Sequence, residues 1–307
     1  MNKSVSKNIA AYIGLSLMTL ITGLSFIFVK IGLRYTDPYS LLAHRFTIAF
    51  IGIVALKLAG LIKIQEIKPG DRIAILGIAL FYPILFFGFQ VLGLQYSTAS
   101  EGGIILAFLP VFMLIAGWLF LKERTTLWQK LGVGLSVLGL IFIFWYKNEA
   151  QSQSIRGIIL LLLSVISMIG YFVIGKRIMQ RYNSLVLTAI MITIGFIAFN
   201  IISVGKHMTE GNIDQFFKPF LNLPFTWSVI YLGILSSVIS SYLSNFALIY
   251  IPTSKISIFS NLNPIIAIIG GVLFLGERLF WYDITGAVAV MFGVILVLAF
   301  KPDNRGI

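Results

Sequence analysis

Few side chains in this sequence could take part in chemistry, and most of them lie inside long apolar runs. Glu101, His44 and Lys255 each lie about one helical turn inside such a run. A charge at the centre of a bilayer costs about 2.5–3.5 kcal/mol on insertion scales, so an ionisable residue there tends to face water or a partner. We therefore expect these residues to be candidates for ion coupling. Snorkelling to the interface is the alternative for Glu101 and Lys255, and a structural hydrogen bond is the alternative for His44.

A second group of polar and aromatic residues recurs at helical spacing and could line a cavity. Its members are Ser25, Tyr82, Phe86, Gln90, Tyr171, Ser236, Ser240, Ser244, Asn261 and Asn263. Ser236 and Ser240 follow Tyr82 and Phe86 by 154 residues, so the two stripes occupy matching positions. A lining of this kind suits a small zwitterionic or amphipathic metabolite that is held by hydrogen bonds. Close helix packing through the serines is the alternative.

The remaining chemistry is sparse. The chain has two histidines and no cysteine, and it lacks the HExxH, Asp-rich and phosphate-binding motifs of membrane enzymes. We therefore expect no catalytic residue, no metal and no cofactor, and a membrane-embedded enzyme or a passive channel is a minor alternative. The net charge of +12 is spread between apolar runs rather than clustered, so nucleic acid is not an expected partner.

These residues must be positioned by membrane helices. Of the 307 residues 58% are hydrophobic and 11% are charged, and the mean hydropathy is +0.97. Apolar runs of about 20 residues can span a bilayer core as helices. Ten such runs occur, near 8–33, 39–62, 71–95, 98–121, 126–146, 155–179, 184–205, 225–249, 252–275 and 280–300. The sequence therefore predicts an all-α integral membrane protein with the lipid bilayer as its surroundings.

The distribution of lysine and arginine predicts the orientation. With ten spans both termini lie on one side, and that side carries the larger share of the basic residues, including Lys3, Lys7 and Lys301. Since basic residues favour the cytoplasmic side, we expect both termini to face the cytoplasm. The expected location is the cytoplasmic (inner) membrane of the cell.

An internal repeat organises the spans. Residues 93–144 align without gaps on residues 247–298, matching LFLKER (119–124) with LFLGER (273–278), and Pro110 with Pro264. We expect two five-helix repeats, 1–150 and 151–307, which cross the membrane in opposite senses because five is odd. Each proline is expected to kink its helix as a hinge, with a packing kink as the alternative. The Glu-Arg pairs are expected to fasten the following hairpins.

These landmarks resemble the EamA family of the drug/metabolite transporter superfamily. The resemblance rests on LPVFMLIAGWLFLKER (109–124), NPIIAIIGGVLFLGER (263–278), SFIFVK (25–30) and AHRF (43–46), and it covers essentially the whole chain. It implies a fold of two inverted five-helix repeats. It also implies export of amino acids or related metabolites, while some relatives export drugs. Arg45 matches a position where the family often has arginine, and we expect it to pair with backbone carbonyls.

The sequence thus predicts a secondary transporter that moves a small metabolite, such as an amino acid, by alternating access around a central cavity. An efflux carrier for drugs or other amphipathic compounds is the alternative. The substrate, the direction of flux, the coupling ion and the oligomeric state do not follow from the residues.

Overall fold

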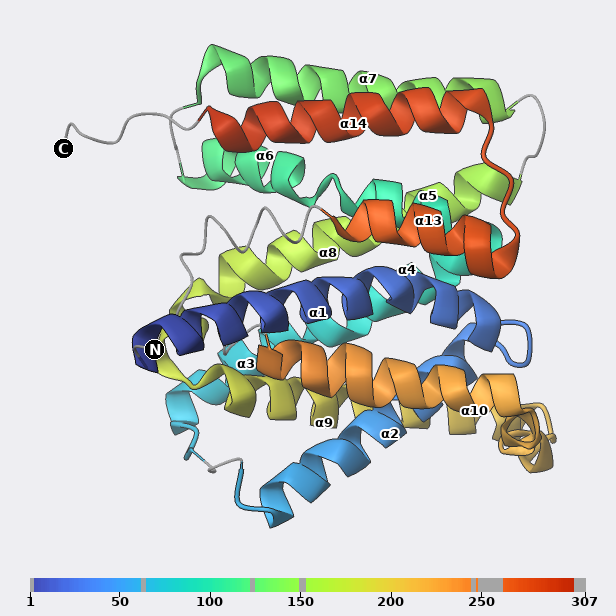
Figure 1. Cartoon of the computed structure of the whole chain (residues 1–307). Coiled ribbons are helices and arrows are strands. Elements are labelled where there is room, and N and C mark those ends of the chain that lie inside the picture. The colour runs from blue at the N-terminus through green and yellow to red at the C-terminus, as the bar shows by residue number, and fades with distance from the viewer. Residues whose placement is uncertain are drawn as a thin grey trace.

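The structure is a computed structural model, and it describes residues 3–61, 65–121, 125–148, 153–243, 247 and 262–300. The described chain is a helical bundle (Figure 1). The first repeat contains α1 (Lys3–Gly32), α2 (Pro38–Leu58), α3 (Arg72–Ala79), the π-helical segment η2 (Leu80–Leu85), α4 (Phe86–Tyr96), α5 (Ala99–Leu106), α6 (Leu109–Leu121) and α7 (Leu127–Asn148). The second contains α8 (Gln153–Arg181), α9 (Ser184–Thr209), α10 (Leu223–Ile230), the π-helical segment η5 (Tyr231–Ile239), α13 (Asn263–Leu275) and α14 (Trp281–Ala299). Short 3₁₀ turns at Pro69–Asp71, Ile213–Gln215 and Lys218–Leu221 join them.

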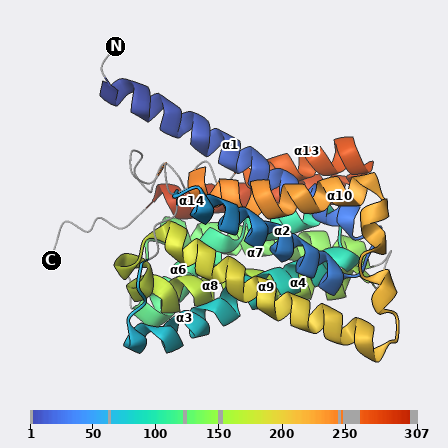
Figure 2. The same cartoon turned by 90° about the horizontal axis from the view of Figure 1, so that it is seen from below.

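The number of apolar helices agrees with the prediction. Within the described residues, eight helices are long and apolar enough to cross a membrane, and Leu127–Ile143 and Asn263–Leu275 are two shorter apolar helices. The start of α1 and the end of α14 lie at the same end of the bundle (Figure 1). We call the other end, which carries the loops 33–37 and 210–222, the Asp37 end. The first turns of α1 extend beyond the other helices (Figure 2).

Equivalent helices of the two repeats pack against each other in opposite directions. In the α2–α9 pair, Ser40 contacts Ser203 near one end, while Phe50 stacks on Phe196 further along. The equivalent helices α7 and α14 are likewise in contact, and α5 of the fourth span packs against α13 of the ninth. The α2–α9 and α7–α14 pairs lie on opposite edges of the bundle (Figure 1). Antiparallel pairing of matching helices is the geometry of an inverted repeat, as predicted.

The glycines that the repeat duplicates meet at the α7–α14 contact. A Cβ atom on Gly132 would stand 2.6 Å from the carbonyl oxygen of Gly293, and one on Gly139 would stand 2.9 Å from that of Gly286. In the repeat, Gly132 corresponds to Gly286 and Gly139 corresponds to Gly293. Exchanging the two repeats therefore turns one of these contacts into the other. Small residues allow such close backbone approach between helices in a membrane, where dispersion contacts rather than the hydrophobic effect hold helices together.

The fourth span of the first repeat is broken. α5 ends at Leu106, a turn occupies residues 107–108, and α6 begins at Leu109. Pro110 therefore lies in the first turn of a new helix, where its missing N–H costs nothing, rather than in a helix interior as predicted. Pro264 has the same place in the first turn of α13. In the fourth span, the turn at residues 107–108 is a sharper interruption than the predicted kink.

The duplicated glycines give a stability test. Gly132→Val is expected to destabilise the protein by about 1–3 kcal/mol, because the new side chain forces α7 away from α14. Gly134→Val is the matched control, since a Cβ at Gly134 on the same helix meets no atom within 4 Å. Thermal unfolding in detergent measures both. Equal melting temperatures for the two variants would contradict the close α7–α14 contact.

Candidate functional site

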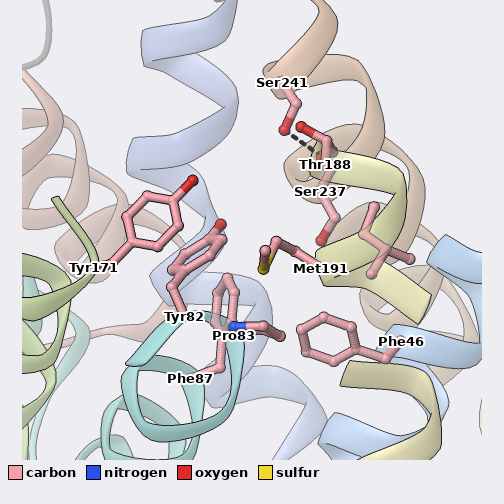
Figure 3. A pocket seen from close by; sticks show the side chains of 10 residues that line it. Phe46, Tyr82, Pro83, Phe87, Tyr171, Thr188, Met191, Ser237 and Ser241 are labelled. Atoms are coloured by element: carbon pink, nitrogen blue, oxygen red, sulfur yellow. Dashed lines mark hydrogen bonds between the residues drawn. The ribbon is translucent and has the colours of Figure 1, made fainter. Parts of the chain in front are cut away.

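A small cavity lies between the two repeats. It encloses about 40 Å³ and is lined by Phe46, Tyr82, Pro83, Phe87, Tyr171, Thr188, Met191, Ile192, Ser237 and Ser241 (Figure 3). The first four of these residues belong to the first repeat and the others belong to the second. One water molecule needs roughly 10–15 Å³ by this kind of measure, so the cavity has room for a few waters but not for a metabolite.

The two π-helical segments place residues on this cavity from matching positions. η2 ends at Leu85 and η5 ends at Ile239, which is 154 residues later. Tyr82 leaves helical geometry altogether, with φ −144° and ψ 113°, and Pro83 follows it. In η5 the Ser237 hydroxyl donates to the carbonyl oxygen of Leu232, five residues earlier, at 2.8 Å. π-helical turns recur at functional sites because they redirect side chains, and here both copies of the repeat carry one.

Aromatic rings form much of the cavity wall. The Tyr82 ring lies 5.0 Å from the Tyr171 ring and 5.2 Å from the Phe87 ring, measured between centroids. Phe46 meets Phe87 edge to face at 5.5 Å. Tyr82 and Tyr171 turn their hydroxyl groups toward the same side of the cavity (Figure 3). The wall therefore combines apolar surface with a few hydroxyl groups.

The predicted serine stripe of the eighth span is displaced by one position. Ser237 and Ser241 line the cavity, whereas Ser236 and Ser240 do not. Ser240 is buried and donates to the carbonyl oxygen of Ser236 at 2.5 Å. The prediction assumed α-helical spacing, but η5 has more residues per turn, so a different face of the segment points inward. Ser244 lies outside the described residues.

The other predicted lining residues divide into two groups. Tyr82 and Tyr171 do line the cavity, while Phe86 stands behind Tyr82 at 5.4 Å and Gln90 is buried further along α4. Ser25 donates to the Thr22 carbonyl oxygen, and the Thr22 hydroxyl donates to Asn263 Oδ1 at 3.0 Å. Asn263 therefore belongs to the α1–α13 contact and Ser25 bonds within α1, and neither lines the cavity. Asn261 lies outside the described residues.

The ion-coupling candidates do not line the cavity either. Glu101 is buried at the start of α5, where its Oε2 accepts from the Thr98 backbone N–H at 2.7 Å and completes a capping box. The His44 ring shares a hydrogen bond of 2.9 Å with the Phe216 carbonyl oxygen and is packed among phenyl rings. Lys255 lies outside the described residues. The geometry favours a structural role for His44, which was its stated alternative.

Glu277 has a different partner from the one predicted. Its carboxylate accepts from the backbone N–H groups of Ala99 and Ser100 at 2.6 and 3.0 Å, so it caps α5 of the other repeat. The following helix, α14, is capped by Asp283, which accepts from the Phe280 N–H. Anionic side chains are favourable at helix N-termini because the dipole and the unpaired N–H groups both attract them. Glu277 thus fastens the two repeats together rather than its own hairpin.

Comparison with known proteins decides the family. The model of the EamA-like transporter family matches residues 9–145 and again residues 155–299. The chain belongs to the EamA-like transporter family. It is therefore a multi-pass integral membrane protein and a transporter rather than an enzyme.

Relatives of this EamA-family chain span nearly its whole length. It is 43% identical over 286 residues to a Bacillus subtilis (strain 168) protein named uncharacterized transporter YcxC, covering 93% of this chain and 91% of the relative. It is 22% identical to a Salmonella typhimurium protein named probable amino-acid metabolite efflux pump, covering 93% and 94%. A solved crystal structure matches with a TM-score of 0.57 at 16% identity, over 94% of this chain and 97% of the other, which shows the fold alone.

Arg45 is the residue near the cavity whose surroundings the sequence did not predict. It was expected to pair with backbone carbonyls, but its hydrogen bonds go to the Ser237 hydroxyl. Its guanidinium lies 4.1 Å from the centre of the Phe87 ring. The signal that was available was a lone arginine inside an apolar span with no acidic residue at helical spacing.

A second, wider pocket of about 330 Å³ opens at the Asp37 end. Asp37 caps α2 there, accepting from the Tyr39 N–H and from the Ser40 hydroxyl at 2.6 Å, and it forms an ion pair of 3.3 Å with Lys206 of α9. Burial by itself would raise the pKa of Asp37, but the Ser40 hydroxyl and the Lys206 ammonium outweigh burial and hold the pKa below its ordinary value. Asp37 therefore links the start of α2 to the end of α9.

This network predicts a pH-dependent stability. Asp37→Ala is expected to lower the free energy of unfolding by about 1–2 kcal/mol at neutral pH, because it removes a cap and an ion pair. A carboxylate with a lowered folded-state pKa stabilises above its ordinary pKa of 3.8 and loses that contribution as the pH falls through the folded-state value. The difference in melting temperature should therefore be constant from neutral pH to about pH 5 and shrink below about pH 4.

Thermal unfolding in detergent across this pH range measures the effect. Asp214→Ala is the control at the same end of the bundle, because Asp214 forms an exposed ion pair with Lys218 and should show no measurable change. If the difference in melting temperature between wild type and Asp37→Ala persists at the lowest pH, the charge of Asp37 is not involved.

Proposed function

We propose that this EamA-family chain is a secondary transporter that exports an amino acid or a related small metabolite. The observation that supports this most directly is the cavity at which the π-helical segments of the two inverted repeats meet. Inverted-repeat transporters bind their substrates between the repeats near the middle of the membrane. A distant relative carries the name of an amino-acid metabolite efflux pump, which agrees with this substrate class.

The proposed mechanism is alternating access. The cavity between the described residues is too small for a metabolite, so in this mechanism the bundle opens at one end to admit the substrate. The broken span at residues 107–108 and the helix starts at Pro110 and Pro264 supply places where the backbone can bend. The repeats would divide near residue 150 and rock against each other around these points. The distribution of basic residues supports an orientation with both termini in the cytoplasm.

The aromatic wall also supports a second candidate, an efflux carrier for amphipathic compounds. Phe46, Phe87 and Tyr82 would offer such compounds a mostly apolar surface. Metabolite profiling inside and outside an overexpressing strain separates the two candidates, since only the first predicts that an endogenous amino acid or metabolite accumulates outside. Uptake into liposomes containing the purified protein should then saturate with that compound, and a response without saturation would indicate a channel.

A disulfide across α2 and α9 tests the mechanism. The hydroxyl oxygens of Ser40 and Ser203 are 2.9 Å apart and buried, and the chain has no cysteine of its own. A cysteine pair at these positions is close enough to form a disulfide. We expect oxidation of the Ser40→Cys/Ser203→Cys variant to abolish transport, because the Asp37 end can no longer open, and reduction to restore it. Each single variant is the control. Full transport after complete crosslinking would contradict opening at this end.

Glu101 can be tested for proton coupling without disturbing its cap. Glutamine at the third helical position also completes a capping box, so Glu101→Gln keeps the hydrogen bond to Thr98 while removing the charge. If Glu101 carries the coupled proton, the variant should bind substrate but lose the dependence of transport on a pH gradient. An unchanged pH profile in liposomes would remove Glu101 from the coupling role.

A further inference from the structure

Arg45 is a buried cation that contacts three of the residues lining the cavity, Phe46, Phe87 and Ser237. Its exposed fraction is 2%, and it lies within α2, a helix long and apolar enough to cross a membrane. Its guanidinium contacts Phe87 at 4.1 Å and Phe46 at 5.9 Å, measured to the ring centres, and both rings line the cavity. A charge so far from water normally has an ionic partner, because removing it from water is costly.

No carboxylate neutralises Arg45 within the described parts of the chain. The ion pairs that form there join Arg181 to Asp71, Lys206 to Asp37 and Glu210, and Lys218 to Asp214, and all of them lie at the ends of the bundle. The hydrogen-bond acceptor of Arg45 is the Ser237 hydroxyl, which lies 3.4 Å from both Nε and Nη2. Good N–H···O hydrogen bonds are shorter, with a mode near 2.9–3.0 Å.

Ser237 is a weak partner because its oxygen is neutral and distant. Its hydroxyl donates to the Leu232 carbonyl oxygen and accepts from Arg45, so one neutral oxygen faces two guanidinium nitrogens at 3.4 Å. Guanidinium has five N–H donors in a planar fork, and a neutral oxygen shared at long range uses little of that capacity. The edge formed by Nε and Nη2 matches the two oxygens of a carboxylate.

The cavity lies within reach of this edge. Ser237 accepts from Arg45 and also lines the cavity, so an anion that replaced part of this contact would occupy the cavity itself. The rest of the wall, including Pro83, Met191 and Ile192, is apolar. A ligand that matches both features has a carboxylate at one end and an apolar body at the other.

We propose that Arg45 binds the carboxylate of the transported substrate, with Ser237 as the residue that holds the guanidinium in place when the site is empty. This inference rests on the proposed function and names its substrate class: a small monocarboxylate with an apolar body, with or without an amino group. Arg45 then changes from a stacked cation with a weak neutral acceptor to one half of a bidentate pair as the cavity fills.

Matched pairs of compounds test this in the purified full-length protein. Leucine and leucinamide differ only at the carboxyl group, as do 4-methylpentanoate and 4-methylpentanamide. We expect both carboxylates, and neither amide, to raise the melting temperature in detergent in a saturable way. Arg45→Lys keeps the charge but loses the fork and should weaken binding about tenfold, while Arg45→Gln should remove the response.

Two further variants separate binding from folding. Arg156→Gln is the matched control, because Arg156 also stacks on an aromatic ring, that of Tyr96 at 5.0 Å, but lies exposed and away from the cavity. It should leave the carboxylate response intact. Ser237→Ala removes the weak acceptor and should keep or strengthen carboxylate binding. If Arg45→Gln does not fold, the carboxylate responses of Arg45→Lys and Ser237→Ala decide whether Arg45 binds the carboxylate.

The outcomes distinguish this inference from the proposed function. If wild-type protein shows no carboxylate-dependent shift, or if Arg45→Lys responds like wild type, Arg45 is not the carboxylate site. Should liposomes still transport a neutral or cationic compound in that case, the transporter assignment stands and only the substrate class falls. Should carboxylates bind through Arg45 while no compound is transported, the binding inference stands and the export proposal fails.

Discussion

The bundle depends on one constraint, which is that lipid offers no hydrogen bonds to a helix backbone. Every N–H and C=O group within the membrane must find a partner inside the protein. A helix can therefore depart from α geometry only where neighbouring helices bury the departure. The π-helical segments η2 and η5 lie between the repeats, and in η5 the Ser237 hydroxyl takes up the carbonyl oxygen of Leu232. The cavity exists at the place where irregular backbone is tolerated.

The same constraint limits how polar the cavity is. Hydroxyl groups within the spans mostly donate to carbonyl oxygens of the preceding turn of their own helix, as Thr19, Ser167 and Thr193 do. Their protons are then no longer available to a ligand. A count of serines and threonines in the sequence therefore overstates the number of hydrogen-bond donors that face the substrate. Among the described residues near the cavity, Arg45 offers the several N–H groups of its guanidinium.

The fold could be predicted from the sequence far better than the site. Span length and the gapless repeat depend on hydrophobicity and on landmarks such as Pro110 and Pro264, which can be read directly. The inward face of the eighth span could not be predicted in this way. α-Helical spacing selected Ser236 and Ser240, but the π-helical segment turns other serines toward the cavity. The partner of Glu277 was also out of reach, since it comes from the other repeat. Local patterns indicate that a carboxylate caps a helix, but only the tertiary structure shows which helix.

The glycine contact between α7 and α14 has a consequence for how such a protein could arise. Gly132 meets Gly293 and Gly139 meets Gly286, so each half presents the same surface to the other. A surface that is complementary to itself needs only one gene. A single five-helix chain that inserted into the membrane in both orientations would already possess this interface as a homodimer. Fusion of two copies would then have fixed one orientation for each half and freed their remaining surfaces to diverge, as Pro83 and Ser237 have done.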